Sequence, residues 1–329
     1  MTTIKDIAKH SGLGLATISK YLNGGTVKER NRIAIEAAIK ETGFVVNEMA
    51  RGLRSGNSRI IGVVIPELSN IFITTILTYA EAIFRCSGYS MIISDCRTDL
   101  ERELTAVSFM LNKQVDGIIN MPVNRDGRHL LPAIEKRIPI VLIDRTIHEL
   151  KGKVSAVLVD NVRAADEATQ MLINAGHKDI GIILGPEMIF TSQQRLHGYK
   201  QALMRNGIIP QERFVHFSDY TTQGGHERAI HLLTQEKPSA LFATNYEMTL
   251  GVVIAINELN LSMPNDIALI GFDNMQLSKV VKPELTIVEQ PLKEIAEASA
   301  TVMLNLLREK NTKPVNKIFA AKIHVGGSV

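Results

Sequence analysis

Two halves of this chain repeat one short pattern, and that repeat limits the folds that the chain can adopt. RIIGVVIPE at residues 59–67 is similar to KDIGIILGP at residues 178–186: a charge, Ile-Gly, an apolar run and then Pro. Two further pairs follow in the same order: VDGIINMP (115–122) with PSALFATN (238–245), and IPIVLIDR (138–145) with IALIGFDN (267–274). Each is a short continuous apolar run, which is typical of a strand buried on both faces of a parallel sheet.

Segments with helical character lie between these runs. They fall at residues 72–87, 101–113, 163–175, 193–206, 224–235 and 247–259. Alternation of strands and helices predicts two doubly wound α/β lobes. TIVEQPLKEIAEASATVMLNLL is then expected to return the chain to the first lobe as a helix.

Polar residues follow several of the predicted strands. Asp144-Arg145 and Asp273-Asn274 occupy equivalent strand ends in the two halves, Asn245 ends another strand, and Asp95 ends YSMIISD. Ligands of open α/β sheets bind beyond the carboxyl ends of the strands. If the two lobes face each other, these groups converge on one cleft. The alternative, which we favour for Asp95, is that a strand-end carboxylate only caps the following turn.

Composition places the chain among globular proteins. Its 329 residues suffice for two or three domains, and no apolar run reaches the roughly 18–20 residues that span a bilayer. MTTIKDIAKH lacks the apolar region of a signal peptide, and the two cysteines fit a reducing cytoplasm. Cys86 and Cys96 lie in no metal-ligand pattern, so we expect a cytoplasmic protein with no metal, no cofactor and no membrane partner.

Positive charge gathers at the start of the chain. Residues 1–59 hold ten Lys and Arg against five Asp and Glu, whereas the remaining 270 residues hold 27 against 29. A basic head on a near-neutral body indicates a polyanionic partner for the head alone. The alternative is a solvated basic face that has no partner.

Three short helices are expected in this head. Thr3 and Asp6 fit a capping box, and the first helix should end near Gly12, which tolerates the left-handed conformation. The second helix should span about 15–23 and the third 28–42. This order is the helix-turn-helix arrangement, whose second helix enters the DNA major groove. A small helical bundle with no DNA role is the alternative.

The faces of the predicted helices divide as follows. Ile18 and Leu22 anchor the second helix, and Thr17 and Ser19 offer hydroxyls for phosphate or base contacts. The residues expected to point outward are Leu15, Ala16 and Lys20. The apolar positions of the third helix are expected at Ile33, Ala34, Ala37 and Ala38.

Two stretches carry a resemblance to a known family. TIKDIAKHSGLGLATISKYLNG (3–24) resembles the head of the lac repressor (LacI/GalR) family of bacterial transcription regulators. NEMARGLRSGNSRIIGVVIP (47–66) resembles the family's hinge, with its Ala-x-x-Leu motif at Ala50 and Leu53, and the first strand of its core. The resemblance continues to the C-terminus. It implies an α/β protein with an all-α helix-turn-helix head followed by two doubly wound lobes of the periplasmic-binding-protein type.

The expected domains follow from this resemblance. They are the head at 1–46, the hinge at 47–58, and a core at 59–329, with lobe 1 at about 59–160 and 290–318 and lobe 2 at about 161–289 and 319–329. Residues 47–58 are rich in poor helix formers, so we expect this segment to be disordered when free and to fold on binding. The family implies a short hinge helix in the minor groove, where Leu53 and its copy in a second subunit wedge between base steps.

The candidate DNA contacts are therefore Thr3, Leu15, Ala16, Thr17, Ser19, Lys20, Asn23, Lys28, Asn31, Asn47, Ala50 and Leu53. The resemblance also sharpens the list for the cleft. The candidate ligand contacts are Phe72, Asp95, Asp144, Arg145, Thr191, Arg195, Tyr220, Asn245, Asp273 and Glu289. Carboxylates, amides and arginines around an aromatic face suit a sugar-like polyol.

Four positions depart from the family pattern. Gly14 stands where members usually carry Ser or Thr at the helix N-cap, and Leu15-Ala16 replace small or polar residues. Tyr246 replaces an Asp after Asn245, which leaves the identity of the ligand open.

The resemblance implies a homodimeric regulator, expected to be a repressor, that binds a near-palindromic double-stranded DNA operator under control of a small sugar-like effector. Control by a phosphorylated carrier protein and a solute-binding role are the alternatives. An enzyme is disfavoured, because no GxGxxG follows a strand and no GxSxG is present.

Overall fold

The computed structural model describes residues 2–22, 24–45, 57–273, 275–309 and 312–329. The chain divides into two compact units, residues 1–58 and residues 59–329. We call them the head unit and the core unit. Of the hinge expected at 47–58, residues 47–56 lie outside the described residues, as do Asn23 and Asn274.

The head unit contains three helices around a small apolar core. They are α1 (Ile4–Ser11), α2 (Leu15–Leu22) and α3 (Glu29–Thr42). Gly12 and Gly43 adopt φ of 67° and 61° and end α1 and α3, as glycine does most easily. The core is built from the buried side chains Ile7, Ile18, Ile35 and Ala38. Each helix contributes at least one of them, so the three helices stabilise one another.

The predicted apolar face of α3 is partly wrong. Ile33 is 55% exposed and Ala37 is exposed, whereas Ile35 and Ala38 are buried and Ile39 packs against them. Residues 35, 38 and 39 follow the i, i+3, i+4 spacing of one helix face. Ile33 and Ala37 lie on the opposite side of that helix.

Lobe 1 of the core unit is a six-stranded sheet in the order β11-β5-β4-β3-β1-β2. All five strand pairs are parallel. In chain order its elements are β1 (Ile60–Ile65), α5 (Ile71–Cys86), β2 (Ser90–Asp95), α6 (Leu100–Asn112), β3 (Gly117–Asn120), η1 (Arg128–Leu130), α7 (Leu131–Glu135), β4 (Ile140–Ile143), η2 (His148–Leu150) and β5 (Ser155–Val159), joined later by α13 (Leu292–Arg308) and β11 (Asn316–Phe319).

Lobe 2 repeats this design in the order β12-β10-β9-β8-β6-β7. Only the β10–β12 pair is antiparallel among the described strands of this sheet. Its elements are α8 (Asn161–Asn174), β6 (Ile180–Leu184), α9 (Phe190–Arg205), η3 (Glu212–Phe214), β7 (Val215–Phe217), α10 (Thr222–His231), η4 (Leu232–Glu236), β8 (Ala240–Ala243), α11 (Tyr246–Glu258), β9 (Ala268–Phe272), α12 (Met275–Val280), β10 (Thr286–Glu289) and β12 (Lys322–His324).

The six repeated apolar runs all form strands, as predicted, and they are buried on both faces. In β1, Ile61, Val63 and Ile65 join the apolar layer that contains α5 and α13. Val64 faces the opposite layer, which contains α6. A fully buried Ile or Val contributes about 1.5–3 kcal/mol of transfer free energy, so these strands supply much of the stability of each lobe.

Two predicted helices differ from the structure. The helix expected at 224–235 is α10 only to His231, and Leu232–Glu236 form a π-helical turn. TIVEQPLKE was expected to be helical throughout, but Thr286–Glu289 form β10 and α13 begins at Leu292. The β-branched Thr, Ile and Val of β10 fit a buried strand better than a helix.

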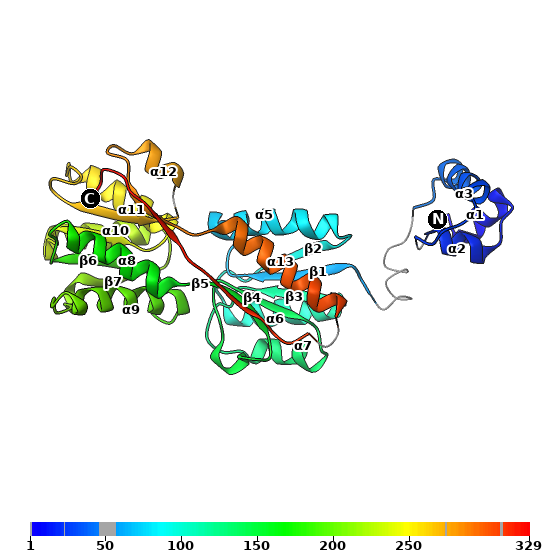
Figure 1. Ribbon diagram of the computed structural model, residues 1–329, viewed down its shortest axis with the longest axis horizontal. Coiled ribbons are helices and arrows are strands. Elements are labelled where there is room, and N and C mark those ends of the chain that lie inside the picture. Colours follow the sequence, from blue (N-terminus) through cyan, green and yellow to red (C-terminus); the bar gives the residue numbers. More distant parts are fainter. Residues whose placement is uncertain (1, 23, 46–56, 274, 310–311) are drawn as a thin grey trace. The chain divides into compact units, whose positions relative to one another are not determined.

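The chain crosses between the lobes three times. The crossings join β5 to α8, β10 to α13 and β11 to β12. Figure 1 shows α13 in orange packed on lobe 1 beside α5, and the red C-terminal segment running from lobe 1 to lobe 2. Parallel strands and three crossings place the carboxyl ends of the central strands where the lobes meet.

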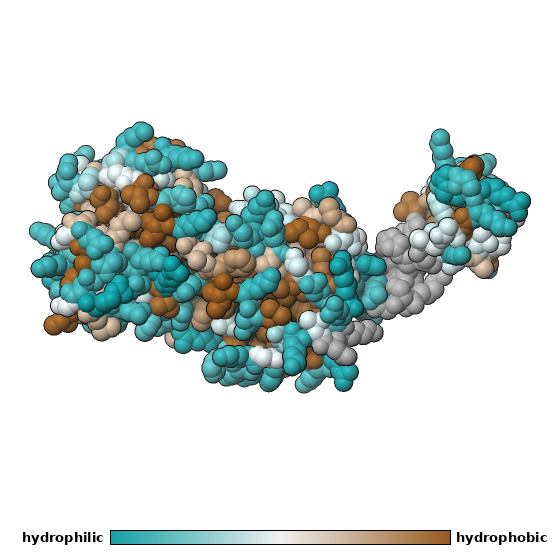
Figure 2. Space-filling model, in the orientation of Figure 1, coloured by the Kyte–Doolittle hydropathy of each residue, from teal (hydrophilic) through white to brown (hydrophobic). Residues whose placement is uncertain are grey.

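The surface of the core unit is mixed in character. Figure 2 shows polar residues over much of the visible face, with apolar residues among them. None of the helices that the structure describes is both long and apolar enough to cross a membrane.

Candidate functional site

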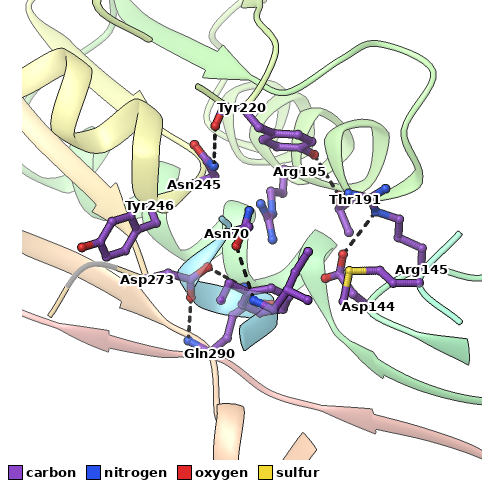
Figure 3. Close-up of a pocket in the computed structure, with 13 residues that line it drawn as sticks. Asn70, Asp144, Arg145, Thr191, Arg195, Tyr220, Asn245, Tyr246, Asp273 and Gln290 are labelled. Atoms are coloured by element: carbon purple, nitrogen blue, oxygen red, sulfur yellow. Dashed lines mark hydrogen bonds and ion pairs between the residues drawn. The ribbon is translucent and has the colours of Figure 1, made fainter. Parts of the chain in front are cut away.

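A cleft between the two lobes gathers polar side chains from both sheets. The space between its walls is about 420 Å³, and this figure includes open solvent at the mouth. Its lining, most of which Figure 3 labels, consists of Asn70, Phe72, Ile73, Met121, Asp144, Arg145, Thr191, Arg195, Tyr220, Asn245, Tyr246, Asp273 and Gln290.

Asp144 and Arg145 form the lobe 1 wall directly after β4. Both side chains are buried, and Arg145 Nε lies 3.3 Å from Asp144 Oδ2. Arg145 also donates Nη1 to the Pro122 carbonyl at 2.9 Å. Burial raises the pKa of Asp144, while the charges of Arg145 and Arg195 oppose that rise. Arg145 Nε is fully buried, and its ion pair with Asp144 is the contact that the described residues provide for it.

Asp273 is the counterpart of Asp144 in lobe 2, directly after β9. Its Oδ2 accepts from Gln290 Nε2 at 2.7 Å, and its Oδ1 accepts from the Gln290 backbone N–H at 3.3 Å. Burial raises the pKa of Asp273 to about 6, against the lowering effects of Arg195 and Gln290. Gln290 Oε1 has no hydrogen-bond partner within the described ranges. Asp273 therefore places its acceptor oxygens at the cleft wall, where Gln290 holds them by hydrogen bonds.

Arg195 links the two carboxylates. Figure 3 shows it on α9, extending into the space near Asp144 and Asp273. Its Nε donates to Asn161 Oδ1 at 2.8 Å and its Nη1 donates to the Thr244 carbonyl at 2.5 Å. Its guanidinium also stacks 4.0 Å from the centre of the Phe272 ring. These contacts hold a buried cation in one orientation, so its remaining N–H groups can face a ligand.

Tyr220 forms one side of the cleft, and several neighbouring groups hold it in place. Its hydroxyl lies 3.0 Å from Thr191 Oγ1 and 2.8 Å from Ser192 Oγ. The backbone of Tyr220 has φ of 66°, and its carbonyl accepts from Asn245 Nδ2 at 3.4 Å. A Cβ at Gly185 would lie 2.0 Å from the tyrosine ring, so only glycine allows the ring to pack there.

The described lining of the cleft contains no His or Cys, and its polar groups are arranged as hydrogen-bond donors and acceptors. Two carboxylates and two arginines nearly balance in charge, and amide groups surround them. Such paired donors and acceptors suit vicinal hydroxyl groups, while Phe72 and Tyr246 supply apolar surface. Among the described residues no group of three or more His, Cys, Asp or Glu could hold a metal ion.

Eight of the ten predicted ligand residues line this cleft, and Asp95 and Glu289 do not. Asp95 is the last residue of β2, at the sheet edge, and accepts from the N–H groups of Leu68 and Arg97 at 3.3 and 2.8 Å. It is a turn cap, the alternative favoured above. Glu289 instead pairs with His324 on β12 at 2.5 Å. Both residues are corrections to the predicted set of cleft residues.

Five lining residues were missed as ligand contacts: Asn70, Ile73, Met121, Tyr246 and Gln290. Gln290 directly follows β10, so the strand-end signal that found Asp273 applies to it as well. Asn70 caps α5, with Oδ1 accepting from the Ile73 N–H at 3.4 Å. Helix N-caps at the carboxyl edge of a parallel sheet are a usable signal for such residues.

The head unit places its predicted DNA contacts on three elements. Leu15, Ala16 and Lys20 are exposed on α2, and Thr17 and Ser19 are half-buried there. Thr3 precedes α1, where its hydroxyl and N–H both donate to Asp6 Oδ2 at 2.8 Å. At the start of α3, Lys28 is exposed and Asn31 is half-buried. The remaining predicted contacts, Asn23, Asn47, Ala50 and Leu53, lie outside the described residues.

A three-helix head joined to a two-lobed unit with a polar cleft defines the class of DNA-binding proteins that carry a periplasmic-binding-protein-like core. Comparison with protein families agrees with this class. Residues 3–47 match the bacterial regulatory proteins of the lacI family, and residues 169–329 match the periplasmic binding protein-like domain.

Individual relatives extend the match to the full chain. Catabolite control protein A of Priestia megaterium is 34% identical over 311 residues, covering 94% of this chain and 93% of its own length. The HTH-type transcriptional repressor CytR of Escherichia coli (strain K12) is 29% identical over 328 residues, covering 99% and 96%. The solved complex of the transcriptional regulator CelR with cellobiose covers 100% of both chains, with 26% identity and a TM-score of 0.75. The chain belongs to the lacI family of bacterial regulatory proteins.

Proposed function

We propose that this protein is a ligand-controlled transcriptional repressor that acts as a homodimer on a near-palindromic operator in the cytoplasm. The observation that carries the proposal is the presence, in one chain, of a helix-turn-helix head and a cleft lined by polar groups from two lobes. Its relatives include proteins named as transcriptional repressors and regulators. Binding, not catalysis, is the role that this combination supports. The domain limits stay as expected from the sequence, at 1–46, 47–58 and 59–329.

The effector in this proposal is a neutral sugar or sugar derivative. Asp144 and Asp273 accept hydroxyl protons, Arg145 and Arg195 donate, and Phe72 packs on C–H groups. A solved relative holds cellobiose, which makes that disaccharide a reasonable first probe. The near balance of two carboxylates and two guanidiniums argues against a strongly anionic effector.

The proposed dimer uses the β2 edge of lobe 1. Every residue of this edge strand is at least partly exposed, and Ile93 on it is 40% exposed. The flanking helices add further exposed apolar side chains: Ile71 and Tyr79 on α5, and Leu100 and Leu104 on α6. Apolar groups gathered along an open sheet edge are typical of a surface that pairs with another chain.

Gel-shift titration against the region upstream of its own gene tests the DNA-binding part of the proposal. A thermal-shift screen of D-ribose, other pentoses, hexoses, cellobiose, sugar acids and sugar phosphates tests the effector part, because a bound ligand raises the melting temperature with its concentration. If the protein binds no DNA specifically under any ligand and salt condition, the proposal that it is a transcriptional regulator is refuted. If the protein binds a phosphorylated carrier protein and responds to no sugar, the proposal of a sugar effector is refuted.

Asp273→Asn is the variant that connects the screen to the cleft. It should abolish the thermal shift of any sugar that binds the unaltered protein, since the amide replaces an acceptor-only carboxylate. Asp179→Asn is the matched control, because Asp179 is exposed on the surface of lobe 2. A sugar that shifts both variants equally binds outside the cleft.

A further inference from the structure

Three buried polar side chains in lobe 1 belong to none of the roles assigned so far. Glu103 on α6 is 1% exposed, Asn120 at the end of β3 is fully buried, and His129 in η1 is 8% exposed. A buried carboxylate and a buried imidazole are rare unless they are paired and hydrogen-bonded. They lie behind the cleft wall, since the next residue after Asn120 is the cleft residue Met121.

The contacts of these three side chains are complementary. Asn120 Nδ2 donates to Glu103 Oε1 at 3.1 Å and to the Val64 carbonyl at 3.3 Å. Because both partners are acceptors, the amide group of Asn120 has one consistent orientation. Its Oδ1 then faces His129 Nε2 at 3.1 Å, and that nitrogen lies 3.4 Å from Glu103 Oε1.

Hydrogen-bond counting assigns one shared proton to Glu103 and His129. His129 Nδ1 lies 3.1 Å from the Asp126 carbonyl, which can only accept, so Nδ1 carries a hydrogen. Nε2 faces two oxygens. Either Nε2 carries a second hydrogen and Glu103 is ionised, or Glu103 is protonated and donates to Nε2. Burial raises the pKa of Glu103 to about 7 and lowers the pKa of His129, so the shared proton lies on Glu103 and is lost to solvent as the pH rises through neutrality, which leaves Glu103 ionised and His129 neutral.

A short stretch of backbone connects this pair to the cleft. The Val123 N–H donates to Glu103 Oε1 at 3.1 Å. One residue earlier, the Pro122 carbonyl accepts from Arg145 Nη1 at 2.9 Å. One residue before that, Met121 lines the cleft. Glu103 therefore holds in place the short stretch of backbone whose carbonyl group accepts a hydrogen bond from a cleft arginine.

We propose that Glu103 is a positioning residue for the cleft: with His129 and Asn120 it sets the place of residues 121–123, and the proton that it shares with His129 alters the orientation of Arg145. The consequence for effector affinity rests on the function proposed above. The ionised carboxylate holds the Val123 N–H and attracts Arg145, whereas the neutral acid holds both less strongly. Effector affinity is therefore higher with Glu103 ionised.

Other ionisable groups surround the pair, and they define the controls. Arg145 faces Glu103 from the end of β4, and Asp126 faces His129 from the loop before η1. Cys96, after β2, lies near Glu103, with Asp95 and Asp99 beyond it, and burial raises the pKa of that thiol to about 12. Cys96 therefore stays protonated across the neutral range, and Asp126, whose pKa is lowered mainly by hydrogen bonds from Arg128, stays ionised.

Methyl NMR of the full-length protein tests the proposal without any ligand. Methionine is labelled at its ¹³C-methyl group, and the Met121 resonance is assigned with Met121→Leu. We expect the Met121 shift to titrate between about pH 6 and about pH 8, and to lose that step in Glu103→Gln, which keeps an acceptor but cannot ionise. Glu258→Gln is the matched control, because Glu258 and His226 form a Glu–His pair at 2.7 Å on the surface of lobe 2. It should retain the step.

A second variant keeps the test decisive if Glu103→Gln folds poorly. His129→Asn retains an N–H toward the Asp126 carbonyl but removes the titrating ring, and it should move the midpoint of the Met121 step. A Met121 resonance that does not titrate, or that titrates identically in both variants and the unaltered protein, overturns the proposal.

Calorimetry with D-ribose and with cellobiose gives the second readout. For a sugar that binds, the dissociation constant of the unaltered protein should rise about threefold to tenfold from about pH 8 to about pH 6, beyond the rise seen in Glu103→Gln. An equal rise in both proteins overturns the link to affinity. If neither sugar binds, the effector proposal is weakened and the methyl titration alone decides the positioning role.

Discussion

At the scale of single residues, Asp144 and Asp273 show how the internal repeat builds the cleft. Each directly follows a central strand, and each adopts a left-handed backbone, with φ of 66° and 63°. Aspartate tolerates this conformation better than most residues, and such strain collects at functional sites. The repeat therefore delivers one carboxylate from each lobe, and Arg195 lies near enough to affect the pKa of both.

Asp273→Asn should change how stability depends on pH. The pKa of Asp273 is raised from 3.8 to about 6, so between these values the folded state holds a proton that the unfolded state has lost. The free energy of unfolding therefore falls as pH rises through this window, by less than about 3 kcal/mol because the side chain is partly exposed. Denaturant titrations at several pH values should show a flatter profile in Asp273→Asn. A profile that is unchanged would contradict the raised pKa.

Gly185→Ala should weaken effector binding without unfolding the protein. The added methyl would meet the Tyr220 ring at 2.0 Å, so the ring must leave its place beside Thr191 and Ser192. Calorimetry with the sugar found by screening should show that its affinity falls by about tenfold or more, because a residue that contacts the sugar has been displaced. Gly207 lies at an exposed turn and has a left-handed backbone. Gly207→Ala is therefore a stability control, because the alanine strains this turn without touching the cleft. Equal affinity losses in both would indicate a general effect.

Strand-end position predicted Asp144, Asn245 and Asp273 correctly as members of one cavity, but two other candidate ligand residues, Asp95 and Glu289, do not line it. Glu289 and Gln290 are adjacent, and adjacent side chains of an extended chain face opposite sides, so an error of one residue selects the wrong one. Asp95 was placed by the same rule, yet β2 is an edge strand. Strand order is set by tertiary packing, which local sequence does not encode.

At the scale of secondary-structure elements, α2 is the part of the head best suited to read DNA. Its buried residue Ile18 fixes its orientation against α1 and α3, while Leu15 is 47% exposed at its first turn. Tyr21 donates its hydroxyl to Glu36 on α3 at 2.7 Å, which adds a polar contact between the two helices. The exposed first turn can therefore approach base edges without disturbing the core.

Exchanging Leu15 and Ala16 should redirect operator choice. Apolar side chains at the start of a recognition helix select bases through contacts with thymine methyl groups, so reversing a large and a small residue alters the preferred base step. Selection from a randomised half-site library measures the outcome. Ile33→Ala is the control, because Ile33 is exposed on α3. An unchanged preference in the exchanged variant would place the reading face elsewhere on the head.

Gly14→Ser should leave operator binding intact or strengthen it. The Gly14 carbonyl accepts from the N–H groups of Thr17 and Ile18, and a Cβ at Gly14 would meet nothing within 4 Å. A serine hydroxyl there can cap α2, which is worth roughly a few tenths of a kcal/mol relative to glycine. Thermal melts and gel-shift titration of the two proteins provide the measurement. A lower melting temperature would show that Gly14 is needed for another reason.

The elements themselves could be predicted well from the sequence, for a physical reason. Continuous apolar runs bounded by Gly, Pro and Asp leave few alternatives to buried parallel strands. β10 was missed because its four residues lie just before a long amphipathic helix, although Pro291 marks the boundary between the two. The third helix of the head was placed correctly, but alanine and isoleucine at successive positions left its buried face ambiguous.

At the scale of the whole molecule, cleft and head belong to one chain, and the proposed control joins them energetically. A sugar that changes operator affinity should do so by about 5–150-fold, which corresponds to about 1–3 kcal/mol of coupling. Thermodynamic reciprocity then requires operator DNA to change sugar affinity by the same factor. Calorimetry of the sugar with and without operator checks this equality, and unequal factors would contradict a simple two-site coupling.

The three crossings between the lobes also determine when each lobe can be finished during synthesis. The lobe 1 sheet lacks its β11 edge until Phe319 is made, and lobe 2 lacks β12 until His324. The fully buried Ser328 accepts from the Thr286 N–H at 2.8 Å and donates to the Leu269 carbonyl at 2.6 Å. The head, by contrast, needs only the first 58 residues for its own core. On the ribosome, the head unit can therefore mature before the core unit, whose two sheets are completed only after Phe319 and His324 have been made.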